Sequence, residues 1–337
     1  MTWDLALPVI WAGIIAMAVF FYVLLDGFDL GIGILFLTRK HEHDRDLMMN
    51  TVAPVWDGNE TWLVIGGAGL MGTFPLAYSV IMPALYLPII VMLIALVFRG
   101  VCFEFRFKAE SAKYIWDYAF FGSSTIATFF QGVNLGAFIQ GFPVEGHTFV
   151  GSAFHWLTPF ALVVGFALLP GYALLGSTWL VMKTEGAVHD HMRKVSEGLL
   201  AAVMVGIAIV SLWVVIFFPD IRARWFTLPT FFYLIPVPLF TALAAFTLWR
   251  ALRKGNDTLP FVMAMALFAL GYLGLGVSRF PRIIPPDITI WDAAADPSAL
   301  TFMLVGAGVV LPVVLGYTFF VYRVFRGKLQ AGHGYEH

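Results

Sequence analysis

Nine long runs of apolar residues constrain the fold of this chain more than any other feature. A bilayer core about 30 Å thick is crossed by about 20 residues of helix, and each run reaches that length. Composition agrees, because 60% of the 337 residues are hydrophobic and only 12% are charged, whereas a typical soluble domain has about 25% charged residues. The sequence therefore predicts an all-α, polytopic membrane protein with nine transmembrane helices, which cover roughly residues 8–38, 51–73, 77–104, 117–140, 156–182, 197–218, 228–250, 258–279 and 299–325.

The Lys and Arg residues predict how these helices are oriented. All but four of the 20 basic residues fall in the odd-numbered connections or the C-terminal tail, and the even-numbered connections hold only Arg222, Arg224, Arg279 and Arg282. Connections rich in Lys and Arg remain in the cytoplasm. The sequence thus predicts that the N-terminus is outside, in the periplasm, and that the C-terminus is cytoplasmic.

Four carboxylates lie in the first two predicted spans, whereas the interiors of spans four to nine have essentially no ionisable residue. Asp26 and Asp29 lie in the first span, and Asp57 and Glu60 lie about two to three turns inside the second. Each pair is spaced i, i+3, which places both carboxylates on one face of the helix. A carboxylate in hydrocarbon costs several kcal/mol or becomes neutral, so such residues face protein or water and are candidates for function.

Two interpretations of these carboxylates are open from the residues alone. In one, they form a proton or cation path that opens to the cytoplasm, as in a proton-coupled transporter or channel. In the other, they hold helices together through hydrogen bonds with Asn59, Thr61 or a neighbouring helix. Asp29 and Asp57 are the first candidates for function, because they lie farther from the helix ends than a snorkelling side chain would.

Arg99 adds a buried positive charge to the third predicted span. It lies a turn or more inside the apolar run, so it needs an acidic partner. Glu104 and Glu60 are the two candidates, and structural charge pairing of Arg99 with Glu104 is predicted. Glu104 is also spaced i, i+4 from Lys108, which offers it a different partner.

The histidines and the single cysteine argue against a metal centre in this chain. No histidine lies in a predicted span, where an intramembrane haem would need an axial ligand. Cys102 is alone, so a thiolate cluster is excluded within the chain. The net charge of −1 gives no indication of nucleic acid binding. We therefore expect no metal and no haem bound by these side chains, with the histidines placed in predicted cytoplasmic loops (His41, His43, His189, His191), near the outer surface (His147, His155) or in the tail (His333, His337).

Four short motifs resemble subunit II of the cytochrome bd quinol oxidases. They are D-G-F-D-L-G at 26–31, A-P-V-W-D-G-N-E-T-W-L at 53–63, F-R-G-V-C-F-E-F-R at 98–106 and W-D-A at 291–293. Most of these motifs fall in the first third of the chain, while the nine-span plan covers all of it. The relatively short length and compact outer loops are similar to the cyanide-insensitive branch of the family.

The resemblance implies a fold, partners and cofactors. Subunit II of this family packs as two four-helix bundles plus one peripheral helix, which divides this chain into 1–145, 146–285 and 286–337. It lies in the bacterial inner membrane beside the haem-bearing subunit I, which carries haem b and a further haem b or haem d. The resemblance also leaves room for a structural quinone and a small single-span accessory subunit, with membrane lipid around the complex.

The resemblance also assigns roles to residues of this chain. It implies that the chain is a haem-free part of a quinol:O2 oxidoreductase and is not catalytic by itself. The carboxylates of the first two helices are implied to take up protons from the cytoplasm, with Asp29 and Asp57 at the matching positions and Asp26 and Glu60 beside them. Trp62 matches a tryptophan associated with O2 access.

Overall fold

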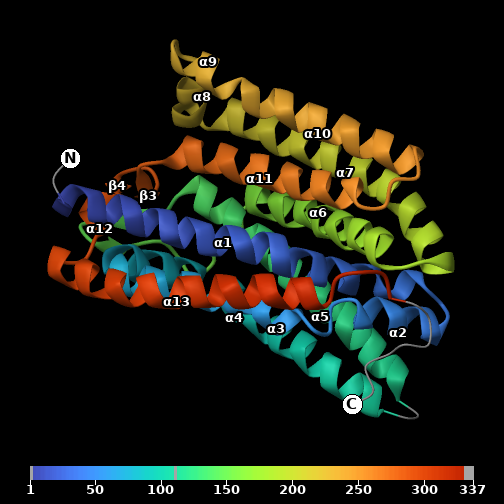
Figure 1. The fold of residues 1–337 in the computed structure, drawn as a ribbon. Helices are drawn as coiled ribbons and strands as arrows, with labels where there is room; N and C mark the ends of the chain where they lie inside the picture. Colours follow the sequence, from blue (N-terminus) through green and yellow to red (C-terminus); the bar gives the residue numbers. More distant parts are fainter. Residues whose placement is uncertain (1–2, 110–111, 330–337) are drawn as a thin grey trace.

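The computed structural model describes residues 3–109 and 112–329, which fold almost entirely into α-helices (Figure 1). Each of the nine predicted apolar runs overlaps a long helix or a pair of consecutive helices. These are α1 (Trp3–Leu35), α3 (Trp56–Thr73), α4 (Pro75–Lys108), α5 (Lys113–Gln140), α6 (Pro159–Lys183), α7 (Gly186–Phe217), α9 (Thr230–Leu234) with α10 (Pro236–Arg253), α11 (Leu259–Arg279) and α13 (Pro297–Val324). The short elements are η1 (Phe36–Thr38), α2 (Glu42–Asn50), α8 (Pro219–Phe226), α12 (Ile290–Ala293) and two antiparallel hairpins, β1 (Val144–Glu145) with β2 (Thr148–Phe149) and β3 (Arg282–Ile284) with β4 (Ile288–Thr289).

Seven helical segments of the described chain are long and apolar enough to cross a bilayer. They are Trp3–Thr38, Pro75–Lys108, Pro159–Lys183, Gly186–Phe217, Thr230–Arg253, Leu259–Arg279 and Pro297–Val324. The other two long helices, α3 and α5, carry more polar side chains, because α3 begins with the Asp57–Glu60 segment and α5 contains Gln131 and Asn134. The all-α membrane fold is confirmed, and the count of nine spans stays a prediction for α3 and α5.

Two helix boundaries differ from the predicted spans in ways that affect the polar residues. Residues 51–55 form turns, and α3 begins only at Trp56. At the other boundary, α7 begins at Gly186 instead of near 197, so His189 and His191 lie in a helix and not in a loop. A helix can continue past the apolar run into water, which hydropathy alone does not reveal.

Helix α1 lies at the centre of the fold, where it packs against α3, α5 and α6. Its contact with α6 is unusually close, because a Cβ on Gly31 would overlap the backbone carbonyl of Tyr172. From the other side, a Cβ on Gly176 would lie 2.5 Å from the carbonyl carbon of Gly31. Small residues permit this approach of two backbones, as they do in other membrane helix pairs.

The remaining long helices arrange themselves around α1 (Figure 1). Helices α3, α4 and α5 pack in sequence on one side, and α6, α7, α10 and α11 pack with one another on the other side. Helix α13 lies along the outside, where it contacts α1 and α3. These contacts are compatible with the predicted division at 1–145, 146–285 and 286–337, which stays a prediction.

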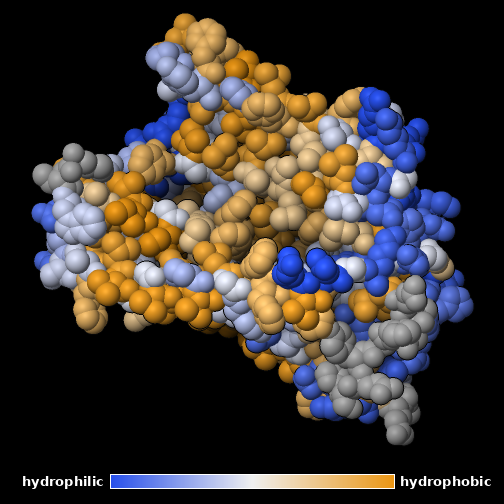
Figure 2. Space-filling view, in the orientation of Figure 1, coloured by the Kyte–Doolittle hydropathy of each residue, from blue (hydrophilic) through white to orange (hydrophobic). Residues whose placement is uncertain are grey.

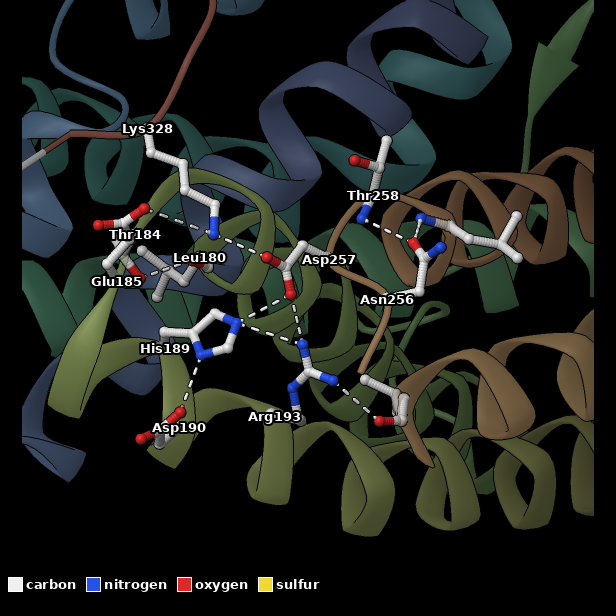
Figure 3. Close-up of polar contacts among 12 residues, drawn as sticks. Leu180, Thr184, Glu185, His189, Asp190, Arg193, Asn256, Asp257, Thr258 and Lys328 are labelled. Carbon is white, nitrogen blue, oxygen red and sulfur yellow. Dashed lines mark hydrogen bonds and ion pairs between the residues drawn. The ribbon is translucent and has the colours of Figure 1, made fainter. Parts of the chain in front are cut away.

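Polar residues gather at the end of the molecule where α2 lies, and apolar residues cover the sides of the long helices (Figure 2). At this polar end the C-terminal segment is fastened to the second group of helices. The Leu329 N–H donates to the carbonyl of Lys183 at 2.8 Å, and Lys328 Nζ donates to Asp257 Oδ2 at 2.7 Å. Asp257 also accepts from Arg193 and contacts His189 Nε2 at 2.9 Å (Figure 3). Asp257 therefore ties α7, the α10–α11 loop and the tail together.

Candidate functional site

The centre of the candidate site is a buried arginine that pairs with carboxylates from two other helices. Arg99 on α4 donates through Nη1 to Asp26 Oδ1 on α1, and through Nη2 to Glu60 Oε2 on α3 at 2.6 Å. Arg99 and Asp26 are fully buried, while the Glu60 side chain is 27% exposed. The Trp56 ring lies 5.9 Å from the guanidinium carbon, within cation–π range. Charges taken out of water are tolerated when they are paired directly, so this ion triad joins three helices in the apolar interior.

Asp29 lies one turn beyond Asp26 and accepts a hydrogen bond from an amide. Asn59 Nδ2 on α3 donates to Asp29 Oδ2 at 2.7 Å and to the carbonyl of Leu25 at 3.3 Å. The hydroxyl of Tyr322 on α13 donates in turn to Asn59 Oδ1 at 2.8 Å. The second carboxylate oxygen, Asp29 Oδ1, is buried with no hydrogen-bond partner among residues 3–109 and 112–329.

Three carboxyl groups therefore lie around one guanidinium, two of them bonded to it directly. Asp26, Asp29 and Glu60 interact electrostatically with one another and with Arg99. Interacting titratable groups bind and release protons as a set and not one by one. Such a set is chemically suited to accept a proton from water on one side and pass it onward.

A recess of about 320 Å³ lies between α3 and α4, beside this set. Its lining includes both Asp57 and Glu60, which confirms that the i, i+3 spacing places them on one helical face. The full lining comprises Trp56, Asp57, Glu60, Thr61, Val64, Leu96, Val97, Gly100 and Val101. Glu60 therefore lines the recess and also binds the buried Arg99.

The depth predicted for Asp57 is wrong. It lies in the first turn of α3, not two to three turns inside the helix, and it is exposed. The predicted span began at 51, but residues 51–55 form turns, so the helix starts later than the apolar run. Asp57 therefore lies at the opening of the recess, outside the buried ion triad.

The predicted pairing of Arg99 with Glu104 is also wrong. Glu104 lies on the outer face of α4 and pairs with Lys108 at 3.2 Å, with both side chains more than half exposed. Five residues along a helix turn a side chain to a different face, so Glu104 points away from Arg99. The alternative partner that the sequence offered, Glu60, does bind Arg99, and Asp26 is a partner that the spacing did not indicate.

Trp62 lies deep in the packing between α3 and α1. It is fully buried, and its ring centre lies 4.8 Å from that of Phe21. Its indole Nε1 has no hydrogen-bond partner among the described residues. The surroundings are apolar, and the role predicted for Trp62 in O2 access stays a prediction.

A second group of buried charges lies near the polar end and was not predicted from the sequence. Arg106 on α4 is fully buried and bonds to Asp117 Oδ1 at 2.6 Å and to Asp46 Oδ1 at 2.5 Å. Arg45 adds an ion pair to Asp117 at 3.3 Å. Nothing in the spacing of Arg106, Asp117 and Asp46 along the chain indicated that they pair.

A chain of hydrogen-bonded polar side chains next to Asp26 was also not predicted from the sequence. Tyr172 on α6 donates to Gln131 Oε1 at 2.8 Å, and Gln131 Nε2 donates to the Tyr22 hydroxyl at 2.6 Å. Tyr22 lies beside Asp26 and acts on it electrostatically. Neutral residues inside apolar runs carry no charge signal, so hydropathy did not single them out.

Metal ligands do not converge in the described part of the chain. Within residues 3–109 and 112–329, no group of three His, Cys, Asp or Glu residues is arranged to hold a metal ion. His43 lies in α2, and the predicted tail residues His333 and His337 lie outside the described residues. That the chain holds no haem stays a prediction.

The fold and the site together define a polytopic α-helical membrane protein with linked titratable groups around one arginine in its interior. The sequence profile described as "Cytochrome bd terminal oxidase subunit II" matches residues 7–325. The chain therefore belongs to the cytochrome bd terminal oxidase subunit II family. Members of this family are parts of an oxidoreductase complex, the cytochrome bd quinol oxidase, and subunit II implies a partner subunit I.

Curated relatives and a solved structure agree with this assignment. The chain is 30% identical to the "Probable cytochrome oxidase subunit 2" of Haemophilus influenzae, over 95% of this chain and 94% of the relative. It is 27% identical to the "Cytochrome bd-I ubiquinol oxidase subunit 2" of Escherichia coli K12 (95% and 94%) and 28% identical to the "Cytochrome bd ubiquinol oxidase subunit 2" of Bacillus subtilis (95% and 96%). Its fold matches a chain of the bd oxidase from Geobacillus thermodenitrificans with a TM-score of 0.77, 16% identity and coverage of 95% and 98%.

Proposed function

We propose that this chain is the haem-free subunit II of a quinol:O2 oxidoreductase, and that it supplies a proton route from the cytoplasm to the O2-reducing site of subunit I. The observation that carries the proposal is the set of Asp26, Asp29 and Glu60 around the buried Arg99, with Glu60 also lining the recess between α3 and α4. Haem b and a second haem, b or d, belong to subunit I in this proposal. The relatives named as ubiquinol oxidase subunits support quinol as the electron donor.

The route begins at Asp57 and reaches the interior through Glu60. Both residues line the α3–α4 recess, and Glu60 binds the same guanidinium as Asp26. A proton that arrives at Glu60 changes the charge next to Arg99 and therefore the protonation equilibria of Asp26 and Asp29. The buried carboxyls respond to the protonation of the exposed ones, which is what an uptake route requires.

Proton uptake on one side of the membrane makes the reaction electrogenic. Reduction of one O2 to two waters takes up four protons, and oxidation of quinol releases protons. If uptake is cytoplasmic and release is periplasmic, charge separates without a pump, and each charge moved against 100 mV stores about 2.3 kcal/mol.

The membrane arrangement belongs to the same proposal. Nine spans, two four-helix bundles with a peripheral α13, a periplasmic N-terminus and a cytoplasmic C-terminus are supported by the helix bounds and by the distribution of Lys and Arg. A reporter that is active only in the periplasm, fused to the C-terminus, should be inactive. An active fusion would contradict the orientation.

Trp62 is proposed to border the access route of O2. Its burial against Phe21 and its unpaired indole give an apolar, water-poor setting that O2 prefers over water. Trp62→Leu should change the KM for O2 with little change in the haem spectrum. A structural quinone and a small accessory subunit stay predictions, without support from the described contacts.

The proton route is tested in the purified complex. Asp29→Asn and Asp57→Asn should each leave assembly and haem content intact and slow O2 consumption, because an amide cannot bind and release a proton at neutral pH. Asp4→Asn is a matched control, since Asp4 is exposed at the opposite end of α1. Unchanged turnover in intact Asp29→Asn and Asp57→Asn complexes would favour carboxylates that only hold helices together.

The oxidase assignment itself has a separate test. A tagged chain purified in mild detergent should bring a haem protein with it, visible in a reduced-minus-oxidised spectrum. Family membership favours this outcome over the transporter or channel that the carboxylates alone left open. Purification without any haem would contradict the assembly proposed here.

A further inference from the structure

The seam between α3 and α13 contains a second recess, separate from the one between α3 and α4. Its volume is about 10 Å³, which is room for about one water molecule. None of its lining residues is shared with the larger recess. The lining consists of Pro54, Val55, Gly58, Asn59, Tyr317, Thr318, Val321 and Tyr322.

Asn59 and Tyr322 connect this small recess to buried Asp29. Both line the recess, and the Tyr322 hydroxyl donates to Asn59 Oδ1 at 2.8 Å. On its other side, Asn59 Nδ2 donates to Asp29 Oδ2 at 2.7 Å. The hydrogen bond between α13 and α3 therefore lies directly behind the hydrogen bond that Asp29 receives.

The donors and acceptors of these groups fix the orientation of the Asn59 amide. An amide oxygen only accepts hydrogen bonds and an amide nitrogen only donates them. In the structure the Tyr322 O–H donates to the amide oxygen, and the amide nitrogen faces Asp29 and the Leu25 carbonyl. An N–H donated to a carboxylate favours the ionised form. Without the hydroxyl the amide oxygen loses this donor, and besides Asp29 only the 3.3 Å bond from Nδ2 to the Leu25 carbonyl opposes a turn of the amide. A turned amide presents its oxygen to Asp29, which only a protonated carboxyl can satisfy.

We propose that Tyr322 is a positioning residue for Asp29: helix α13, through Asn59, sets the protonation behaviour of a carboxyl on α1. This inference rests on the proposed function of Asp29 in proton uptake. The amide does not itself carry a proton in this arrangement; it holds the hydrogen-bond donor toward Asp29. The charged and titratable groups that act on Asp29 besides Tyr322 are Asp26 on α1, Glu60 on α3 and Arg99 on α4.

Tyr322→Phe is the direct test, because it removes the hydroxyl and keeps the ring. A hydrogen bond to a charged group is worth about one factor of ten or more in equilibrium. We therefore expect the pH profile of O2 consumption by the purified complex to shift toward higher pH by about one unit. Haem content and subunit ratio should equal those of the parent complex.

Tyr317→Phe is the matched control. Tyr317 lies on the same helix and lines the same recess, but its side chain is largely exposed and it is the Tyr322 hydroxyl that donates to Asn59. The same substitution there should leave the pH profile unchanged. An equal shift in both variants would overturn the inference, because it would reflect a general change in the seam.

A second measurement works without turnover. The carboxylic C=O band of Asp29, identified in infrared difference spectra by its loss in Asp29→Asn, should change in position or pH dependence in Tyr322→Phe and not in Tyr317→Phe. An unaltered band and profile in Tyr322→Phe, with Asp29→Asn still slow, would reject the role of Tyr322 and leave the proton route intact. Full turnover in Asp29→Asn would reject the route and this inference with it.

Discussion

Arg99→Met removes the only guanidinium of the ion triad and keeps a side chain of similar length. In the parent protein Arg99 is fully buried and forms ion pairs with Asp26, which is also fully buried, and with Glu60, which is about a quarter exposed. After the substitution at least one carboxylate is left in the interior without a positive partner. Breaking a buried ion pair in this way typically costs about 3–5 kcal/mol, and we expect a loss of this size in the free energy of unfolding.

Arg253→Met is the matched control, because it shows how much free energy of unfolding is lost when an exposed ion pair is removed. Arg253 on α10 lies 3.6 Å from Glu197, with the two side chains 60% and 37% exposed. Exposed pairs of this kind contribute about 0–1 kcal/mol. The two substitutions are chemically identical, so the difference between them isolates the effect of burial.

The assay is reversible unfolding of the complex in mixed micelles, followed by tryptophan fluorescence. The cycle is completed with Asp26→Asn and with the double variant Arg99→Met/Asp26→Asn. If the triad is formed as described, the double variant should be more stable than Arg99→Met alone, because the uncompensated charge of Asp26 has been removed. A loss in Arg99→Met no larger than in Arg253→Met would show that Arg99 is not paired in the interior.

Two further predictions concern packing and the polar end. Gly31→Ala should destabilise the protein by about 1–3 kcal/mol or more, because a Cβ there meets the α6 backbone, whereas Gly13→Ala, with open space around it, should be neutral in the same assay. Burial alone would raise the pKa of Asp257, but hydrogen bonds from Lys328 and His189 hold it below its ordinary value. The stability that Asp257 contributes is therefore present at neutral pH and is lost as pH falls through this lowered pKa, so proteolysis after Lys328 should increase at acid pH and, in Asp257→Asn, already at pH 7.

The helices of the membrane fold could be predicted from the sequence because a run of about 20 apolar residues is long enough to stand out in a hydropathy average. All nine predicted runs coincide with helices, and the ends agree to within a few residues at most boundaries. The exceptions are segments whose polarity and backbone conformation do not match. At Gly186 a polar helix continues outside the apolar run, and at 51–55 an apolar run begins before its helix.

Partners within the site could not be predicted to the same degree. Arg99 visibly needed a carboxylate, yet the sequence could not decide between its two candidates, Glu60 and Glu104, because the rotation of the helices was unknown. Spacing along one helix found the shared face of Asp57 and Glu60, because that relation is local. The contact of Arg99 with Asp26 joins positions 73 residues apart and depends on how α1 and α4 are both packed against α3 and α5.

The motif at 26–31 allows α1 to present carboxylates on one side and to pack closely against α6 on another. At about 100° per residue, Asp26 and Asp29 lie on one side of α1, and Gly27 and Gly31 lie on a side about 150° away. The structure places the carboxylates against Arg99 and Asn59, and the glycines against α6. The glycine side is packed directly against α6, and the two carboxylates face α3 and α4. The glycines of the motif thus contribute to the placement of the carboxylates, although none of them carries a titratable group.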